Sequence, residues 1–184
     1  MAAHSAPNRQ PPTHVKLSEI LQGKWLGHPV HAALVHIPVG SWTAACLLDI
    51  AHQAQWMTAD TGRLPTYLVG FGLLGALLAV APGIADWLPI KKEKPAWKLG
   101  LYHMLLNALA VVAWAANFYL RLQSDAVVTN AILGTSVVGT LLVFVSGYLG
   151  SRMVFDQGTS VARHSKKEWR EIARAGGSRV PEEK

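Results

Sequence analysis

The chain has 184 residues, of which 51% are hydrophobic and only 15% are charged, and its net charge is +6. This composition is more apolar and far less charged than that of soluble globular domains, and the length allows one compact domain. The lone cysteine, Cys46, excludes an internal disulfide and a cysteine-based metal site within one chain. No phosphate-binding glycine loop, nucleophile elbow or HExxH pair occurs, so the sequence does not indicate an enzyme.

Residues 1–26 form a polar N-terminal segment. Residues 1–12, MAAHSAPNRQPP, are polar and rich in proline, with no short apolar run beside them, so we expect no cleavable signal peptide. Residues 14–26, HVKLSEILQGKWL, place most of their apolar side chains on one face of a helix. We therefore expect an amphipathic helix that lies in the membrane interface before the first span.

Four long runs without Asp, Glu, Lys or Arg come next, at 29–48, 66–85, 99–120 and 126–151. Each has about 20 residues or more, the length that a helix needs to cross about 30 Å of hydrocarbon. Backbone groups in lipid must be paired within the segment, so these runs are predicted to be helices. We predict an all-α, integral membrane four-helix bundle over 27–156, embedded in a lipid bilayer, with spans at about 29–52, 66–89, 96–121 and 126–150.

Residues 157–184 form a basic tail. Ser165 and Glu168 have the spacing of a helix capping box, and Gly176 and Gly177 end the pattern, which predicts a short helix. Four spans place this tail on the same side of the membrane as the N-terminal segment. That side carries 15 of the 17 Lys and Arg residues, and only Arg63 and Arg121 fall on the other side. This bias predicts that both termini are cytoplasmic. Anionic lipid head groups account for the net positive charge, so we expect no nucleic-acid partner.

Histidines gather at the predicted cytoplasmic ends of the spans. His28 and His31 lie at the mouth of the first span. His36 is seven residues into that span, and His103 is seven residues into the third, which runs in the same direction. Both imidazoles should therefore lie about 10 Å below the start of their helices. An ionisable group inside a membrane is costly, so we expect a functional site here.

Other polar residues extend this site. Asp86 closes the second span at the same surface, Asn107 lies one turn from His103 on the same helix face, and Arg152 follows the fourth span. The outer half of the membrane holds few comparable residues, namely Asp49, His52 and Asn117. The sequence therefore places the candidate site near the cytoplasmic surface.

Four motifs carry a family resemblance. They are GHPVHAALVHIPVG at 27–40, GIADWL closing the second span, HMLLNALA in the third, and GYLGSRMVFDQGTSV after the fourth. In order and spacing they resemble domain of unknown function 2231, a family of four-helix bacterial membrane proteins, over about residues 25–162. The resemblance implies a multi-pass protein of the bacterial cytoplasmic (inner) membrane and implies no established activity. Some relatives are fused to Rieske-type iron–sulfur domains, which implies redox surroundings.

The favoured interpretation is structural. Asp86, Asn107, His36 and His103 would form a buried polar network that fixes helix register. The protein would then be a structural or accessory subunit of a membrane redox complex, with partner membrane or redox subunits.

Two alternatives remain open. In the first, a b-type haem is held between His36 and His103, and Arg152 or Lys98 contacts its propionates. In the second, His28, His31 and Asp86 contribute to a non-haem metal or proton site, since imidazole and carboxylate suit zinc, copper or iron.

Overall fold

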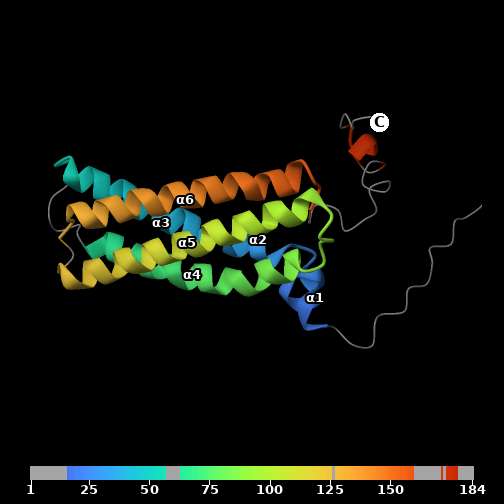
Figure 1. Ribbon diagram of the computed structural model, residues 1–184, viewed down its shortest axis with the longest axis horizontal. Coiled ribbons are helices and arrows are strands. Elements are labelled where there is room, and N and C mark those ends of the chain that lie inside the picture. Colours follow the sequence, from blue (N-terminus) through green and yellow to red (C-terminus); the bar gives the residue numbers. More distant parts are fainter. Residues whose placement is uncertain (1–15, 57–62, 126, 160–170, 172, 178–184) are drawn as a thin grey trace, which may run out of the picture.

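The computed structural model describes residues 16–56, 63–125, 127–159, 171 and 173–177. Throughout these residues the only regular secondary structure is helical, and four long helices run side by side (Figure 1). In chain order the elements are α1 (Leu17–Leu21), the 3₁₀ helix η1 (Lys24–Leu26), α2 (Val30–Leu34), α3 (His36–Gln53), α4 (Arg63–Trp87), α5 (Pro95–Gln123) and α6 (Asn130–Phe155).

The four-span prediction is confirmed. Four segments are long and apolar enough to cross a membrane: Val30–Gln53, Arg63–Trp87, Pro95–Gln123 and Asn130–Phe155. The fourth begins later than expected because the Thr129 side chain caps it, accepting a hydrogen bond from the Ile132 amide at 3.2 Å. It also ends later, at Phe155, where the Arg152 and Asp156 side chains pair at 2.8 Å.

The first span consists of two helices, α2 followed by α3. Val35 separates them, and Pro38 lies in the first turn of α3. Proline has no amide hydrogen to donate to the carbonyl four residues earlier, here that of Leu34. The α-helical pattern therefore breaks at the end of α2. Pro82, by contrast, lies inside α4 without dividing it.

Two stacked indoles fill the middle of the bundle. Trp42 of α3 and Trp114 of α5 have ring centroids 5.5 Å apart and planes inclined by 12°. Each indole packs against a glycine of a neighbouring helix. A Cβ at Gly72 would lie 2.3 Å from Trp42 Nε1, and one at Gly139 would lie 2.6 Å from Trp114 Nε1. These two glycines are therefore required by close packing, and the indoles separate the two ends of the bundle.

A short N-terminal element packs against α4. The side chain of Gln22, which follows α1, donates a 2.7 Å hydrogen bond to the carbonyl of Ala85. Gly23 then turns the chain with φ +68°, and a Cβ there would lie 2.2 Å from the His28 carbonyl oxygen. The amphipathic helix expected over 14–26 is thus two short helices, and residues 14 and 15 lie outside the described part.

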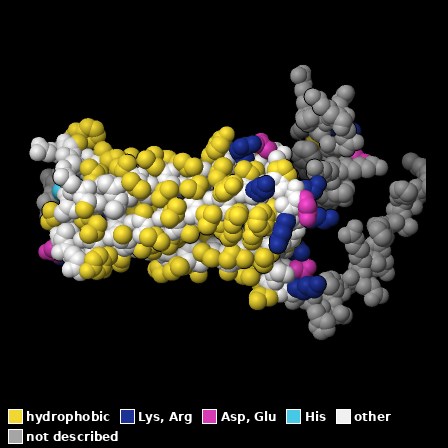
Figure 2. Space-filling model, in the orientation of Figure 1, with side chains coloured by type: hydrophobic (Ala, Val, Ile, Leu, Met, Phe, Trp, Pro, Cys, Tyr) yellow, Lys and Arg dark blue, Asp and Glu magenta, His cyan; other side chains and the backbone are white. Residues whose placement is uncertain are grey.

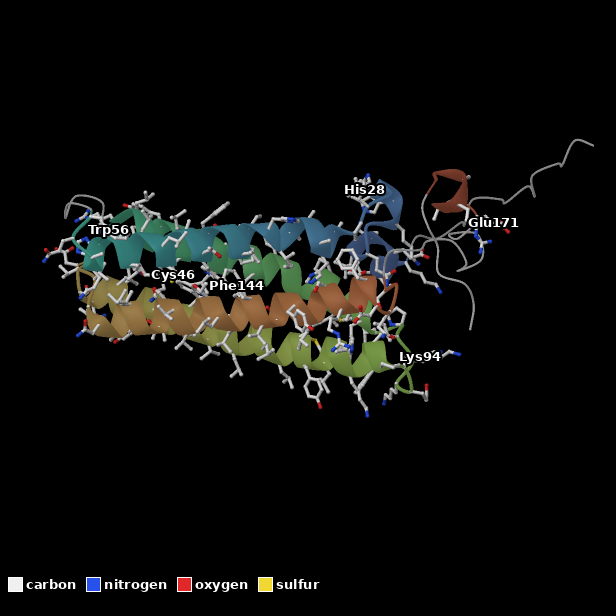
Figure 3. The ribbon with its side chains drawn as sticks, turned by 90° about the horizontal axis from the view of Figure 1, so that it is seen from above. His28, Cys46, Trp56, Lys94, Phe144 and Glu171 are labelled. Atoms are coloured by element: carbon white, nitrogen blue, oxygen red, sulfur yellow. The ribbon has the colours of Figure 1, made fainter. Side chains whose placement is uncertain are left out.

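Charge and apolar surface are segregated along the bundle. Figure 2 shows hydrophobic side chains along its length and the Lys and Arg side chains concentrated at one end. The labelled His28 and Lys94 lie at that end and Trp56 at the other (Figure 3). Helix α1 and the end of α6 share the charged end (Figure 1). The capping residues of the expected tail helix, Ser165 and Glu168, lie outside the described residues.

Candidate functional site

Two imidazoles meet at the charged end of the bundle, which we call the histidine site. His31 of α2 and His103 of α5 have ring centroids 6.4 Å apart and ring planes inclined by 86°. Both residues are half-buried. They come from different helices and lie across the bundle from each other, so this end does bring two histidines together.

A backbone carbonyl of a neighbouring helix holds the His31 ring. Its Nδ1 lies 2.9 Å from the carbonyl oxygen of Ala79 on α4. A carbonyl oxygen only accepts, so Nδ1 carries the proton and Nε2 keeps the lone pair in the neutral ring. Gly83, one turn along α4, makes room for the ring, because a Cβ there would lie 2.8 Å from its Nδ1 and Cε1.

The His103 ring is held in the same way on the opposite side. Its Nδ1 lies 2.8 Å from the carbonyl oxygen of Ser146 on α6 and 2.9 Å from that residue's hydroxyl. The hydroxyl in turn donates to the His103 carbonyl at 3.0 Å. Gly150 lies beside this ring, where a Cβ would be 3.2 Å from Cε1. Each imidazole therefore has a carbonyl on its Nδ1 and a glycine against its ring.

Asn107 and Asp86 complete the surroundings of the pair. The Asn107 amide nitrogen lies 3.0 Å from His103 Nε2, which confirms the expectation that these two residues share a helix face. Asp86 is half-buried near the end of α4, and its carboxyl group interacts electrostatically with His31. Of the expected network, Asn107 thus bonds to His103, and Asp86 lies on the His31 side.

The predicted pairing of His36 with His103 is wrong. His36 is exposed, and its Nδ1 lies 3.3 Å from the carbonyl oxygen of Ala33 in its own span. Five residues separate His31 from His36, a rotation of about 140° around a helix, so the two rings cannot face the same neighbour. The sequence predicted His36 at the level of His103, whereas the structure places His31, five residues nearer the start of the span, beside His103.

Three further residues predicted near the site are exposed: Arg152 and Lys98, the expected propionate contacts, and His28 of the expected metal set. Arg152 binds Asp156 through a 2.8 Å bond between exposed side chains, and Lys98 is also exposed. His28 is exposed in the turn before Pro29, ahead of the first helix residue of α2. Across the described ranges, no three His, Cys, Asp or Glu residues are grouped so that they could hold a metal ion. The set His28, His31 and Asp86 is therefore not assembled as a metal centre.

A second polar cluster lies at the other end of the bundle, and we call it the ion-pair cluster. It comprises Asp49 of α3, Asn117 and Arg121 of α5, and Ser136 of α6, and each is at most 1% exposed. Asp49 Oδ2 accepts hydrogen bonds from Arg121 Nη2 and, at 2.6 Å, from the Ser136 hydroxyl. Arg121 Nε donates to the side-chain oxygen Oδ1 of Asn117 at 2.8 Å.

Asn117 ties this cluster to α6. Its amide nitrogen lies 2.9 Å from the Ile132 carbonyl, 2.8 Å from the Thr135 hydroxyl and 2.9 Å from the Ser136 hydroxyl. The sequence placed Arg121 among the charges of the outer surface, so this cluster was not predicted. The sequence signal for this cluster is that two opposite charges, Asp49 and Arg121, lie near the ends of the first and third spans, which run in the same direction.

Comparison with known proteins identifies the family of this chain. Residues 27–163 match the family described as "Predicted membrane protein (DUF2231)", which is well over half of the chain. The chain therefore belongs to this family, as its motifs indicated. No curated protein and no solved structure matches it significantly.

Proposed function

We propose that this member of the DUF2231 family is an electron-transfer module of a membrane redox complex, with His31 and His103 as the axial ligands of a b-type haem. One observation carries the proposal: two half-buried imidazoles from different helices lie across the bundle, 6.4 Å between ring centroids. In this proposal the protein carries electrons and does not itself catalyse a reaction. A bound haem would supply the one-electron carrier.

The chemistry of the donor set favours haem over a bare metal ion. A zinc or copper site takes three or four ligands from the protein, and the described residues do not gather such a group. Haem iron takes four nitrogens from its own macrocycle, so two histidines complete its coordination. Two imidazoles on one metal have ring centres about 6 Å apart, because each metal–nitrogen bond is about 2 Å long.

The hydrogen bonds of the two rings support the same proposal. Metal-bound histidines usually donate their other ring N–H to a carbonyl or carboxylate, which fixes the tautomer and the ring orientation. His31 and His103 each have Nδ1 against a backbone carbonyl, at 2.9 and 2.8 Å. Their Nε2 atoms are therefore the ones suited to a ligand. Asn107 is bonded to His103 Nε2 and has to release it before that atom can bind a metal.

The second candidate is the structural role, and the bond from Asn107 is what favours it. In the protein alone both nitrogens of His103 have hydrogen-bond partners. Buried polar contacts of this kind fix the register of packed helices in membranes, at about 0.6 kcal/mol each on average. In this role the protein would be an accessory subunit that binds partner membrane subunits and carries no cofactor.

An absorption spectrum distinguishes the two candidates. The protein would be purified in mild detergent from haem-replete cells and reduced with dithionite, and haem would also be titrated into any colourless fraction. We expect the bands of a six-coordinate, low-spin haem, which disappear in His31→Ala and in His103→Ala. His36→Ala is the matched control and should keep them, because His36 is exposed on the same span. A protein that stays colourless after haem addition contradicts the electron-transfer role and favours the structural one.

The charge distribution supports a placement in the bacterial inner membrane with both termini in the cytoplasm. Lys and Arg side chains crowd the end of the bundle that holds the histidine site (Figure 2), and positive charge favours the cytoplasmic side. Reporter fusions at position 1 and after position 184 should both be cytoplasmic, whereas one inserted at 57–62 should be outside. An outside signal from either terminal fusion would reverse this orientation.

A further inference from the structure

The ion-pair cluster leaves polar atoms without partners. Among the described residues, Asp49 Oδ1 and Arg121 Nη1 of this cluster are buried without a hydrogen-bond partner, and so is Nδ1 of His52, which follows Asp49 on α3. Leaving such a group unsatisfied costs about 1–3 kcal/mol, and more when it is charged, so native proteins pair nearly all of them. Asp49 and Arg121 bind each other through Oδ2 and Nη2, so the two unpaired atoms belong to one buried ion pair.

Charge decides what can occupy this place. A cation next to Asp49 would also face the guanidinium of Arg121, and an anion next to Arg121 would face the carboxylate. The pair is neutral overall, so it favours a neutral molecule. That molecule must accept a hydrogen bond from Nη1 and donate one to Oδ1. Water does both and commonly fills buried polar sites of this kind.

Burial limits the size of the molecule that can bind the ion pair. The end of α3 indicates the route by which this molecule enters. The side chains of Asp49 and Arg121 are 0% exposed, so nothing much larger than water can reach them directly. His52 lies three residues after Asp49, on the same helix face, and α3 ends one residue later at Gln53. It is half-buried, and in the chain it lies between Asp49 and Trp56, which marks the outer end of the bundle in Figure 3.

We propose that the ion-pair cluster is an internal water-binding site: at least one water is held by Asp49 Oδ1 and Arg121 Nη1, and it exchanges with the outer aqueous phase past His52. The site is separate from the histidine site, because the stacked Trp42 and Trp114 fill the bundle between them. It requires no haem, so it can be tested whatever the outcome of the haem experiment.

Radiolytic labelling tests the presence of water. Hydroxyl radicals formed from a bound water oxidise the side chains beside it, even when those side chains are buried. Ile132, next to Asn117, and Val69, in the apolar core, are both 0% exposed and β-branched, so they form a matched pair. We expect at least fivefold more oxidation at Ile132 than at Val69. Equal, low oxidation at both positions would overturn the proposal.

Two variants test what holds the water and how it enters. In the double variant Asp49→Leu/Arg121→Leu, oxidation of Ile132 should fall to the level of Val69, and persistence of the signal would refute the assignment. His52→Phe keeps the ion pair and should slow the incorporation of ¹⁸O at Ile132 at least tenfold after mixing with H₂¹⁸O. An unchanged rate would refute the route past His52. Because His52→Phe keeps the ion pair, it tests the route even if the double variant does not fold.

Discussion

The two ends of the bundle use polar residues in opposite ways. At the histidine site, backbone carbonyls of α4 and α6 orient the half-buried rings of His31 and His103 through their Nδ1 atoms. In the ion-pair cluster, the fully buried side chains of Asp49 and Arg121 bind each other. The ion-pair cluster thus buries two opposite charges completely, whereas the histidine site holds two half-buried rings against backbone carbonyls.

Distance makes this comparison testable. Asp49 lies 18 residues after His31 along the first span, so the two sites are separated by about 27 Å of helix. Substitutions that far apart, without shared partners, usually have additive effects on stability. Variants at one end should therefore leave the properties of the other end unchanged.

The largest effect is expected from breaking the buried ion pair. Asp49→Leu or Arg121→Leu alone leaves one uncompensated charge at a fully buried position, and each should lower the free energy of unfolding by about 3–5 kcal/mol. Equilibrium unfolding in mixed detergent micelles measures this. The double variant should recover most of the loss, because well-packed apolar residues often replace a buried ion pair at little cost. Additive losses would mean that the charges do not act as a pair.

A smaller effect is expected from filling the space beside a histidine ring. Gly83→Ala places a Cβ 2.8 Å from the His31 ring, so the ring or α4 must shift, at a cost of about 1–3 kcal/mol. Gly147→Ala is the control, because nothing lies within 4 Å of a Cβ at that position. Helix propensity alone would make the control slightly more stable. If both variants unfold alike, Gly83 has no packing role at the histidine site.

The sequence predicted what depends on composition and spacing along one helix. Four uncharged runs of sufficient length required four spans, and these are present. The four-residue spacing of His103 and Asn107 placed them on one face, and their side chains are hydrogen-bonded. Neither inference needs knowledge of how the helices pack.

What the sequence could not predict depends on contacts between helices. His31 and His36 have similar surroundings in the sequence, and only the packing of α2 against α4 turns His31 toward Ala79 and leaves His36 exposed. Arg121 looked like a surface charge because it follows an uncharged run. Its burial depends on Asp49 lying opposite on α3, 72 residues away in the chain.

A still smaller effect separates the two functions considered for the histidine site. Asn107→Ala removes the hydrogen bond to His103 Nε2, worth about 0.5–1.5 kcal/mol. If Nε2 binds haem iron, that bond has to be broken on binding, so the variant should bind haem up to about tenfold more tightly. Titration of the colourless protein with haem, followed by its absorption, measures this. Weaker binding would show that Asn107 supports the ligand instead of competing with it.

The smallest effect is expected from an exposed ion pair between an Arg and an Asp at the end of α6. Arg152 and Asp156 are joined at 2.8 Å across one turn at the end of α6, and their side chains are 45% and 48% exposed. Water and salt screen such a pair, so Asp156→Asn should change the free energy of unfolding by no more than about 0.5 kcal/mol. The same unfolding assay, run beside the Asp49 variants, checks it. Two ion pairs of the same chemistry would then differ severalfold in their effect, because only one of them is buried. A loss comparable to that of Asp49→Leu would show that burial is not what distinguishes the two ends.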